Sequence, residues 1–340
     1  MNSPSHALQG HLHRAGVSKI IVVVVNWNGM RYLGECLDSL SKQSFRAFDT
    51  ILVDNGSVDG SVDFVRLNYP EVRIVSLTEN VGFAAANNIV LRTVEAEYMA
   101  LLNNDAVADP HWLESLLLGL EAHPEAGFAA SKMLSYDHPN EIDRAGDAYT
   151  WGGTGLLRGR GLRAHRLDAQ EWVFGACAGA ALYRTSMLRE IGFFDEDFFL
   201  LYEDVDLSFR AQLTGYRCLY VPGAIVRHKG SGSIIHDSAT SVYYSHRNLE
   251  WVYVKNMPSG LICKTICFHL IYDMASFLFF MATGKGKEFL KAKLDALRGF
   301  KKALRKRRKI QSKKKVSDKY LWRVFEKEWL LPRLTRRLAK

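Results

Sequence analysis

The sequence of 340 residues contains only five cysteines, and no two of them form a Cys-x-x-Cys pair. Cys36, Cys177 and Cys218 are widely separated, whereas Cys263 and Cys267 are four residues apart. This spacing argues against a structural zinc site and against a disulfide framework, because both need clustered or paired cysteines. Scattered thiols are typical of a protein from a reducing compartment.

Common sequence signatures of nucleotide binding and covalent catalysis are also missing. No Gly-x-Gly-x-x-Gly follows a predicted strand and no Gly-x-x-x-x-Gly-Lys-Ser/Thr occurs, which disfavours a dinucleotide-dependent dehydrogenase and a P-loop NTPase. No Ser/His/Asp or Cys/His set suggests a covalent nucleophile. Residues 1–18 have no apolar run of the signal-peptide kind, and we expect a flexible leader there.

Charge is divided unevenly along the chain. Apolar residues make up 48% and charged residues 24%, which excludes wholesale disorder. Residues 285–340 contain 22 Lys and Arg against 5 Asp and Glu, a net charge of +17, whereas residues 1–284 carry a net charge of −8. The sequence therefore predicts an acidic body with a strongly basic extension.

The first 128 residues alternate between strand and helix patterns. Lys19–Val25 reads KIIVVVV, a run typical of a strand that is buried on both faces of a parallel sheet. Further strands are predicted at 50–53, 72–77 and 98–102, and helices at 33–40, 61–69, 82–94 and 109–122. This alternation predicts an α/β fold with a mostly parallel sheet between helices.

The pattern changes after Phe128. Residues 144–166 are rich in Gly and Arg and predict a hairpin or mobile loop, whereas 217–228 reads as strand, turn and strand. Residues 261–283 are apolar but interrupted by Lys264, His269 and Asp273. Lys264 and Asp273 would fall on opposite helix faces, so a buried or membrane-interfacial helix is favoured over a membrane span.

Amides and carboxylates follow three of the predicted strands: Asn26 and Asn28 after the first, Asp54 after the second and Asn103-Asn104-Asp105 after the fourth. In an open parallel sheet, ligands bind outside the carboxyl ends of the strands. Although a single Asp after a strand is often only a helix cap, three such ends together predict a ligand site.

These residues belong to motifs that resemble family 2 glycosyltransferases of the GT-A fold, in the order of that family. The resemblance covers about residues 19–235 and is strongest with the rhamnosyltransferase-like bacterial branch. It implies a catalytic domain at 19–240, with a nucleotide-sugar-binding half at 19–128 and an acceptor half at 129–240, followed by a basic helical extension at 241–340. The resembling motifs are VVVVNWNG (22–29), VDNGS (53–57), ENVGFAAANN (79–88), LLNNDA (101–106), GACAGAALYR (175–184), IGFFDEDFFLLYEDVDLSFR (191–210) and VRHKGSGS (226–233).

The resemblance implies a donor site and a divalent metal site. Asp54 would contact the nucleotide base, because a carboxylate can accept from the ring N–H of a pyrimidine. Asp105 would bind Mg²⁺ or Mn²⁺, with His228 as a second ligand. Asn103 stands where the family's DXD motif has its first Asp, which leaves one carboxylate in that element. The other residues expected at the donor are Asn26, Asn28, Gly82, Asn87, Asn88, Asn103 and Asn104.

The resemblance also implies a catalytic base. Asp204, in Glu203-Asp204-Val205-Asp206, falls where the family's base lies and would take the proton of the acceptor hydroxyl. Acids at a helix start can equally serve only to stabilise the helix, and for Asp206 we accept that role. Gly179, Asp195 and Glu203 are expected on the acceptor side.

The basic extension predicts a membrane surface as partner. Apolar residues recur among the basic ones, as in helices that lie on anionic membranes. The alternatives are a basic face packed on the body by its apolar stripe, or nucleic-acid binding, which lacks a recognised binding motif. The stripe residues are Leu290, Leu294, Leu297, Leu304, Tyr320, Trp322, Phe325 and Trp329.

The sequence therefore predicts a metal-dependent, inverting glycosyltransferase at the cytoplasmic face of the cell membrane. It would move a sugar, with rhamnose as one candidate, from a nucleoside diphosphate to a growing, lipid-linked glycan, without nucleic acid as a partner. The rival hypothesis is a non-catalytic nucleotide-sugar-binding or nucleic-acid-binding adaptor. Asp204 together with Asp105 favours the enzyme.

Overall fold

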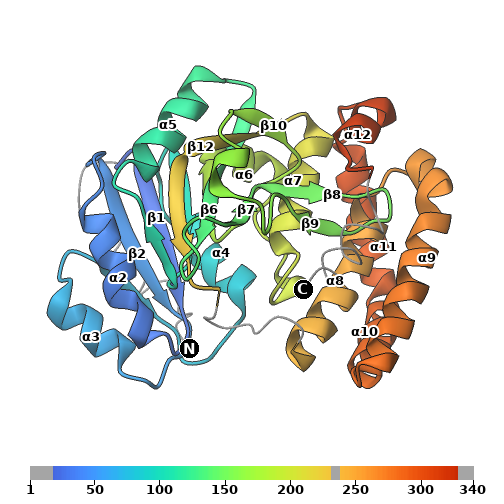
Figure 1. The fold of residues 1–340 in the computed structure, drawn as a ribbon, viewed down its shortest axis with the longest axis horizontal. Helices are drawn as coiled ribbons and strands as arrows, with labels where there is room; N and C mark the ends of the chain where they lie inside the picture. The colour runs from blue at the N-terminus through green and yellow to red at the C-terminus, as the bar shows by residue number, and fades with distance from the viewer. Residues whose placement is uncertain (1–17, 231–237, 328–340) are drawn as a thin grey trace.

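A computed structural model describes residues 18–230 and 238–327, and its centre is a ten-stranded mixed sheet (Figure 1). Trp329, the leader up to residue 17 and the end of the VRHKGSGS motif lie outside the described residues. Across the sheet the order is β3 (Arg73–Ser76), β2 (Phe48–Asp54), β1 (Ile20–Asn26), β4 (Tyr98–Leu102), β11 (Ala180–Arg184), β6 (Ala126–Ser135), β12 (Arg217–His228) and β10 (Glu171–Val173), with β5 (Ala106–Ala108) beside β12 and β7 (Ile142–Ala145) beside β6.

The strand directions bring the expected site residues to one edge of the sheet. Strands β1 to β4 are parallel, and β11 runs antiparallel between β4 and β6. Because β12 is parallel to β6, the end of β12 at His228 lies at the same edge as the ends of β1 and β4, and β11 begins there at Ala180.

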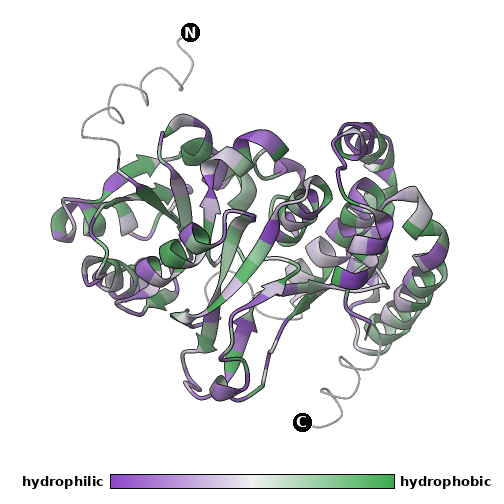
Figure 2. Ribbon diagram, turned by 90° about the horizontal axis from the view of Figure 1, so that it is seen from above, coloured by the Kyte–Doolittle hydropathy of each residue, from purple (hydrophilic) through white to green (hydrophobic). Residues whose placement is uncertain are grey.

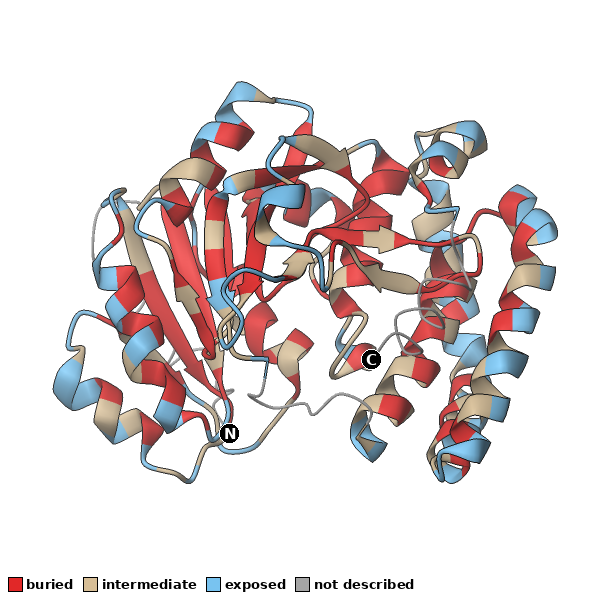
Figure 3. Ribbon diagram, in the orientation of Figure 1, coloured by how far each residue is buried: buried red, intermediate tan, exposed pale blue. Residues whose placement is uncertain are grey.

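Helices cover both faces of this sheet, whose central strands are buried (Figure 3). Apolar side chains of one face pack with one set of helices and those of the other face with a second set. The first set is α2 (Met30–Ser41), α3 (Ser61–Asn68) and α5 (Trp112–Ala122); the second is α4 (Phe83–Thr93), α6 (Thr185–Ile191) and α7 (Glu203–Thr214).

The C-terminal helices pack beside the sheet at the end that carries β10 and the small hairpin of β8 (Asp147–Tyr149) and β9 (Gly155–Leu157) (Figure 1). A third apolar core joins this hairpin and α7 to the last helices. They are α8 (Ala239–Asn256), α9 (Ser259–Ala282), α11 (Phe300–Ser312) and α12 (Asp318–Val324). Helix α10 (Gly286–Arg298) packs with α8 and α9 in a separate small apolar cluster. Two short 3-10 turns, η1 (Ala164–Arg166) and η2 (Glu196–Phe198), complete the fold.

Aromatic residues of the basic extension belong to the third core. Phe325 is 2% exposed and packs on Tyr149, and Trp322 stacks on Trp151 with ring centroids 4.2 Å apart. These aromatic residues were expected at a membrane, but they cover the acceptor half instead. The expected boundary at residue 240 therefore does not separate two cores.

The secondary structure of the first half is confirmed, and the predicted hairpin within 144–166 is β8–β9. The short strands β5, β7, β10 and β11 were not predicted, and β6 and β12 also differ from expectation. Pro222-Gly223 was predicted to form a turn, but β12 continues through it with a register shift between Val221 and Ile225. Strand β6 was not predicted, because its Ala-, Gly- and Ser-rich sequence lacks the β-branched residues that mark the other strands.

Within residues 18–230 and 238–327, one helix has the length and apolar composition of a membrane span, namely α9. Only 22% of its most apolar 18-residue window is buried in the protein.

Candidate functional site

The ends of β1, β2 and β4 are joined by a chain of buried side-chain hydrogen bonds. Asn104 Nδ2 donates to Asn26 Oδ1 at 2.7 Å, and Asn26 Nδ2 donates to Asp54 Oδ1 at 3.1 Å. Asp54 Oδ2 also accepts the backbone N–H of Ser57 at 3.0 Å. The structure thus brings together the three strand ends that the sequence singled out. It also shows that their polar atoms hold the loops to one another.

The loop after β1 is more open to solvent. Asn28 has a φ of 50°, and its Oδ1 accepts the backbone N–H of Val58 at 2.9 Å. Trp27, between the two asparagines, is 42% exposed. Exposed aromatic and amide groups thus border the buried network.

Gly82, Asn87 and Asn88, which were expected at the donor, form contacts within the protein. The Asn87 amide donates to the Phe83 carbonyl within α4, and Asn88 Nδ2 donates to the Phe194 carbonyl, both at 2.9 Å. Both side chains are buried. Gly82 has a φ of 87°, and a Cβ there would lie 2.6 Å from the Phe199 carbonyl oxygen. Its small size therefore serves a backbone contact rather than a ligand.

His228 lies between two carboxylates at the end of β12. Its Nε2 is 3.3 Å from Asp105 Oδ1, and its Nδ1 is 3.0 Å from Asp143 Oδ2. Burial would lower the pKa of His228, but the bonds to Asp105 and Asp143 outweigh it and raise the pKa to about 9. Burial opposes ionisation of Asp143, yet His228 and two arginines lower its pKa to about 2.

Asn103 and Gly179 pack against each other at the start of β11. The backbone N–H of Asn103 donates to the Gly179 carbonyl at 2.9 Å, and a Cβ on Gly179 would lie 2.9 Å from Asn103 Nδ2. Any larger residue at 179 would push Asn103 aside.

Glu203 and Asp204 begin α7 beside this edge. Asp204 Oδ2 accepts the backbone N–H of Ala178 at 3.3 Å, which ties the carboxylate to the segment that enters β11. Glu203 is buried, and its Oε2 has no hydrogen-bond partner among the residues that the structure describes. Burial and the nearby Asp204 raise the pKa of Glu203 to about 8, so its neutral form is favoured.

Arg144 and Asp147 were not predicted for the site but lie next to Asp204. Arg144 Nη1 is 3.8 Å from Asp204 Oδ2 and 3.5 Å from Asp147 Oδ1. Burial raises the pKa of Asp147 to about 7 although Arg144 opposes this. The sequence signal was the charged run Asp143-Arg144-x-x-Asp147. Arg144 and Asp147 fell in the segment 144–166, which was predicted only to form a hairpin or mobile loop.

The turn before α7 is strained and held from outside. Phe199, Leu201 and Tyr202 all have φ values between 60° and 71°, which is rare for residues other than glycine. Asn248 Nδ2 of α8 lies within 3.0 Å of three carbonyl oxygens of this turn, those of Phe198, Leu200 and Leu201. A residue of the extension thus fixes the turn that presents Asp204.

Asp195 is engaged by lysines of the extension. Its carboxylate is bonded to Lys255 of α8 and Lys306 of α11, whose charges lower its pKa although burial opposes this. Both carboxylate oxygens are therefore engaged within the protein, and the expected acceptor role of Asp195 stays a prediction. Asp206 bonds to Arg210 Nε at 2.9 Å and to Lys255 Nζ at 2.9 Å, in agreement with its expected bracing role.

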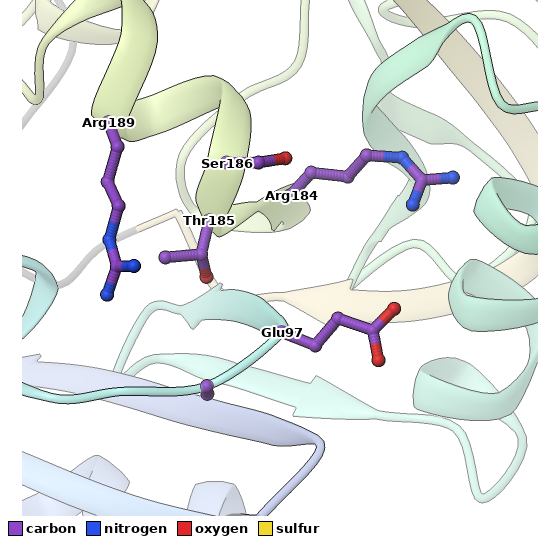
Figure 4. A pocket seen from close by; sticks show the side chains of 6 residues that line it. Glu97, Arg184, Thr185, Ser186 and Arg189 are labelled. Carbon is purple, nitrogen blue, oxygen red and sulfur yellow. The ribbon is translucent and has the colours of Figure 1, made fainter.

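Two other features lie away from this edge. Glu250, His269 and Asp273 have ligand atoms within 4.8 Å of one another, but Lys293 bonds to both carboxylates, so the cluster is an ion-pair network. A cavity of about 280 Å³ lies at the amino end of β4, opposite the strand-end edge (Figure 4). It is lined by Ala96, Glu97, Arg184, Thr185, Ser186 and Arg189.

Comparison with known proteins gives one matching family, described as glycosyl transferase family 2, over residues 21–192. An N-acetylglucosaminyl-diphospho-decaprenol L-rhamnosyltransferase of Mycobacterium tuberculosis is 27% identical over 266 residues, which cover 70% of this chain and 85% of the relative. An uncharacterised glycosyltransferase of Bacillus subtilis, YwdF, is 29% identical over 214 residues, covering 61% of this chain and 73% of the relative.

Solved structures share the fold at low sequence identity. S. aureus TarS 1-349 in complex with UDP-GlcNAc is 18% identical with a TM-score of 0.56, covering 86% of this chain and 88% of that one. The mannosyltransferase PcManGT of Pyrobaculum calidifontis, in complex with GDP-Man and Mn²⁺, is 16% identical with a TM-score of 0.54 and covers 94% of both chains.

Proposed function

Because the chain belongs to glycosyl transferase family 2, we propose that it transfers a sugar from a nucleoside diphosphate to a growing, lipid-linked cell-surface glycan. Its fold is the GT-A fold, as expected. The M. tuberculosis relative, an N-acetylglucosaminyl-diphospho-decaprenol L-rhamnosyltransferase, supports a lipid-linked acceptor and makes rhamnose the first sugar to test. Such an acceptor implies work at the cytoplasmic face of the cell membrane.

One observation carries this proposal: Asp204 is held at the sheet edge where β4 and β12 end. The Ala178 N–H binds its carboxylate at 3.3 Å, two residues before Ala180 pairs with Leu102 at the end of β4. Sugar transfer needs a carboxylate that can take the proton of the acceptor hydroxyl beside the bound nucleotide sugar.

In the proposed reaction, Asp204 accepts the proton of the acceptor hydroxyl. The hydroxyl oxygen attacks the anomeric carbon from the face opposite the diphosphate, and the bond from carbon to the diphosphate oxygen breaks. This single displacement inverts the anomeric configuration. Arg144 Nη1 lies 3.8 Å from Asp204 Oδ2 and would help to hold the carboxylate in place.

Asp105 and His228 are the proposed metal ligands. Their oxygen and nitrogen atoms are 3.3 Å apart, so both can reach one small cation, and an imidazole with a single carboxylate suits Mn²⁺ better than Mg²⁺. Asp143, on the other nitrogen of His228, would fix the ring with Nε2 toward the cation. A bound cation stabilises the negative charge that develops on the departing diphosphate.

For the nucleotide we propose Asp54 and Asn28, with Trp27 as an exposed ring against which a base can stack. Asn26 and Asn104 would form the floor beneath them, because their amides already bond within the protein. On the acceptor side we retain Glu203 and the close backbone approach at Gly179.

A thermal-shift screen of nucleotide sugars with Mn²⁺ or Mg²⁺, followed by a transfer assay, tests this function. A ligand at 100 times its dissociation constant raises the free energy of unfolding by about 2.7 kcal/mol. Donor binding without hydrolysis or transfer to any glycan acceptor would favour the adaptor hypothesis instead.

A further inference from the structure

Helix α9 exposes an apolar face, and it buries two polar side chains together with Leu261, Tyr272 and Phe280. Residues that point inward include Thr265 and His269, at 0% and 2% exposure, whereas Met274 and Leu278 are 59% and 60% exposed. A helix on the surface of a soluble protein buries its apolar side and exposes its polar side. The outer face from Cys267 to Ala282 is uncharged and consists of Cys267, Leu270, Ile271, Met274, Ala275, Leu278, Met281 and Ala282.

The inward polar side chains of α9 are fully used by neighbouring elements. His269 Nδ1 lies 2.9 Å from the Gly152 carbonyl oxygen, and its Nε2 lies 3.1 Å from Glu250 on α8. Lys293 of α10 bonds to both Glu250 and Asp273. These contacts fix the orientation of α9, so its apolar face is held outward by the fold.

The neighbouring helix α10 continues this apolar surface and adds positive charge. Leu290, Leu294 and Leu297 are 47% to 68% exposed and follow helical spacing along one side. Exposed Lys287 and Lys291 lie beside them. Figure 2 shows hydrophobic residues along the outermost helix of the molecule, which is α9.

We propose that the outer face of α9 and the leucine stripe of α10 together insert into one leaflet of an anionic membrane, with both helices lying flat on it. An apolar face of this size beside basic side chains matches an anionic lipid surface in both hydrophobicity and charge.

The same contacts argue against α9 as a membrane span. Lys293 and Glu250 are tied to Asp273 and His269 at the middle of α9, so a spanning α9 would carry charged parts of α8 and α10 into the bilayer core. Ionisable groups at that depth are costly. A flat orientation leaves these groups on the protein side of the helix.

The proposal rests on the proposed function only for the identity of the membrane. The exposed apolar face of α9 is a feature of the fold and does not depend on any activity. It is tested with the full-length protein and vesicles of phosphatidylglycerol mixed with phosphatidylcholine. Met274→Glu/Leu278→Glu charges the outer face. Leu67→Glu/Leu118→Glu is the matched control, since these leucines on α3 and α5 are 82% and 60% exposed.

We expect the α9 double variant to lower vesicle partitioning at least about tenfold, because each charge must leave the interface or be buried in lipid. The control variant should bind vesicles as the wild type does, and both should keep the wild-type melting temperature. Wild-type binding should be weaker on pure phosphatidylcholine and in 1 M salt.

Three results would overturn the proposal. The first is that the α9 double variant binds vesicles as the wild type does. The second is that the wild-type protein resists alkaline extraction from membranes, as a membrane-spanning protein does. The third is that the double substitution only dissociates a dimer of this chain. Transfer to a short soluble acceptor separates the two claims. If transfer fails while vesicle binding follows the expected pattern, the proposed function is wrong and the membrane face stands.

Discussion

The side-chain nitrogen of Asn248 lies 2.7 Å from the carbonyl oxygen of Leu201, in the strained turn that precedes the proposed base. The turn adopts φ values that cost free energy, and the helix that holds it also carries Glu250, the partner of α9. The helices proposed to lie on a membrane and the turn before the proposed base are therefore linked through a single helix, α8.

Asn248→Ala should lower kcat by about tenfold, because the turn loses the donor that fixes the position of Asp204. The dissociation constant for the nucleotide sugar should change little, since the donor side is formed by other strands. Steady-state kinetics and calorimetric donor binding check this. Equal losses in binding and turnover would mean that Asn248 supports the whole fold.

Asp204→Asn should reduce kcat by about 10²–10⁴-fold and leave donor binding nearly intact, because the residue acts on the acceptor proton. The amide can still accept the N–H of Ala178, so the local fold is kept. Near-normal turnover by this variant would remove Asp204 from the mechanism.

Asp105→Ala should weaken Mn²⁺ binding more than His228→Ala, because Asp105 is the one carboxylate in its Asn-Asn-Asp element. Asp143→Asn should have a smaller effect, about 10- to 100-fold, since it acts through the orientation of His228. Mn²⁺ titration followed by electron paramagnetic resonance measures each affinity without turnover. If a variant binds Mn²⁺ with wild-type affinity, the substituted residue is not a metal ligand.

Glu203→Gln should change how stability depends on pH. The pKa of Glu203 is raised from 4.5 to about 8, so between these values the unfolded chain loses a proton that the folded protein keeps. The wild type therefore loses stability relative to Glu203→Gln as the pH rises from 5 to 8, by more than about 1 kcal/mol. Urea unfolding of both proteins at three pH values tests the sign; parallel curves would show that Glu203 is ionised when folded.

Phe325→Ala should lower the free energy of unfolding by about 3–5 kcal/mol, because the ring fills an aromatic cluster with Tyr149, Phe174 and Phe209. Leu67→Ala, at an exposed position of α3, is the control and should change stability by less than about 0.5 kcal/mol.

Deleting residues 285–340 removes Phe325 from this cluster. The deletion should therefore unfold the proposed acceptor half as well as release the protein from membranes.

The sequence predicted well wherever one segment carried its own signal. The β-branched run before Asn26 specified a buried strand, and the polar residues after three strands met at one edge as parallel topology requires. The continuity of strand β12 was missed because Pro222-Gly223 has the local signature of a turn, whereas pairing with β6 on both sides of it sustains one strand.

Contacts between distant residues could not be predicted. The bond from Lys306 to Asp195 joins positions 111 residues apart, and nothing near either residue indicates its partner. The orientation of α9 was hidden for a related reason. Asp273 looked like an interruption of an apolar segment until Lys293 and Glu250 were seen to enclose it.

The short pairing between Glu326 and the β8 hairpin has a consequence for how the chain folds during synthesis. Glu326 donates its backbone N–H to the Tyr149 carbonyl at 2.8 Å, next to the cluster that Phe325 completes. Strands β1 to β4 end by residue 102 and can form while the ribosome is still translating. The core around the β8 hairpin is complete only after residue 326 has emerged, and until then its aromatic surface is open to chaperones or to aggregation.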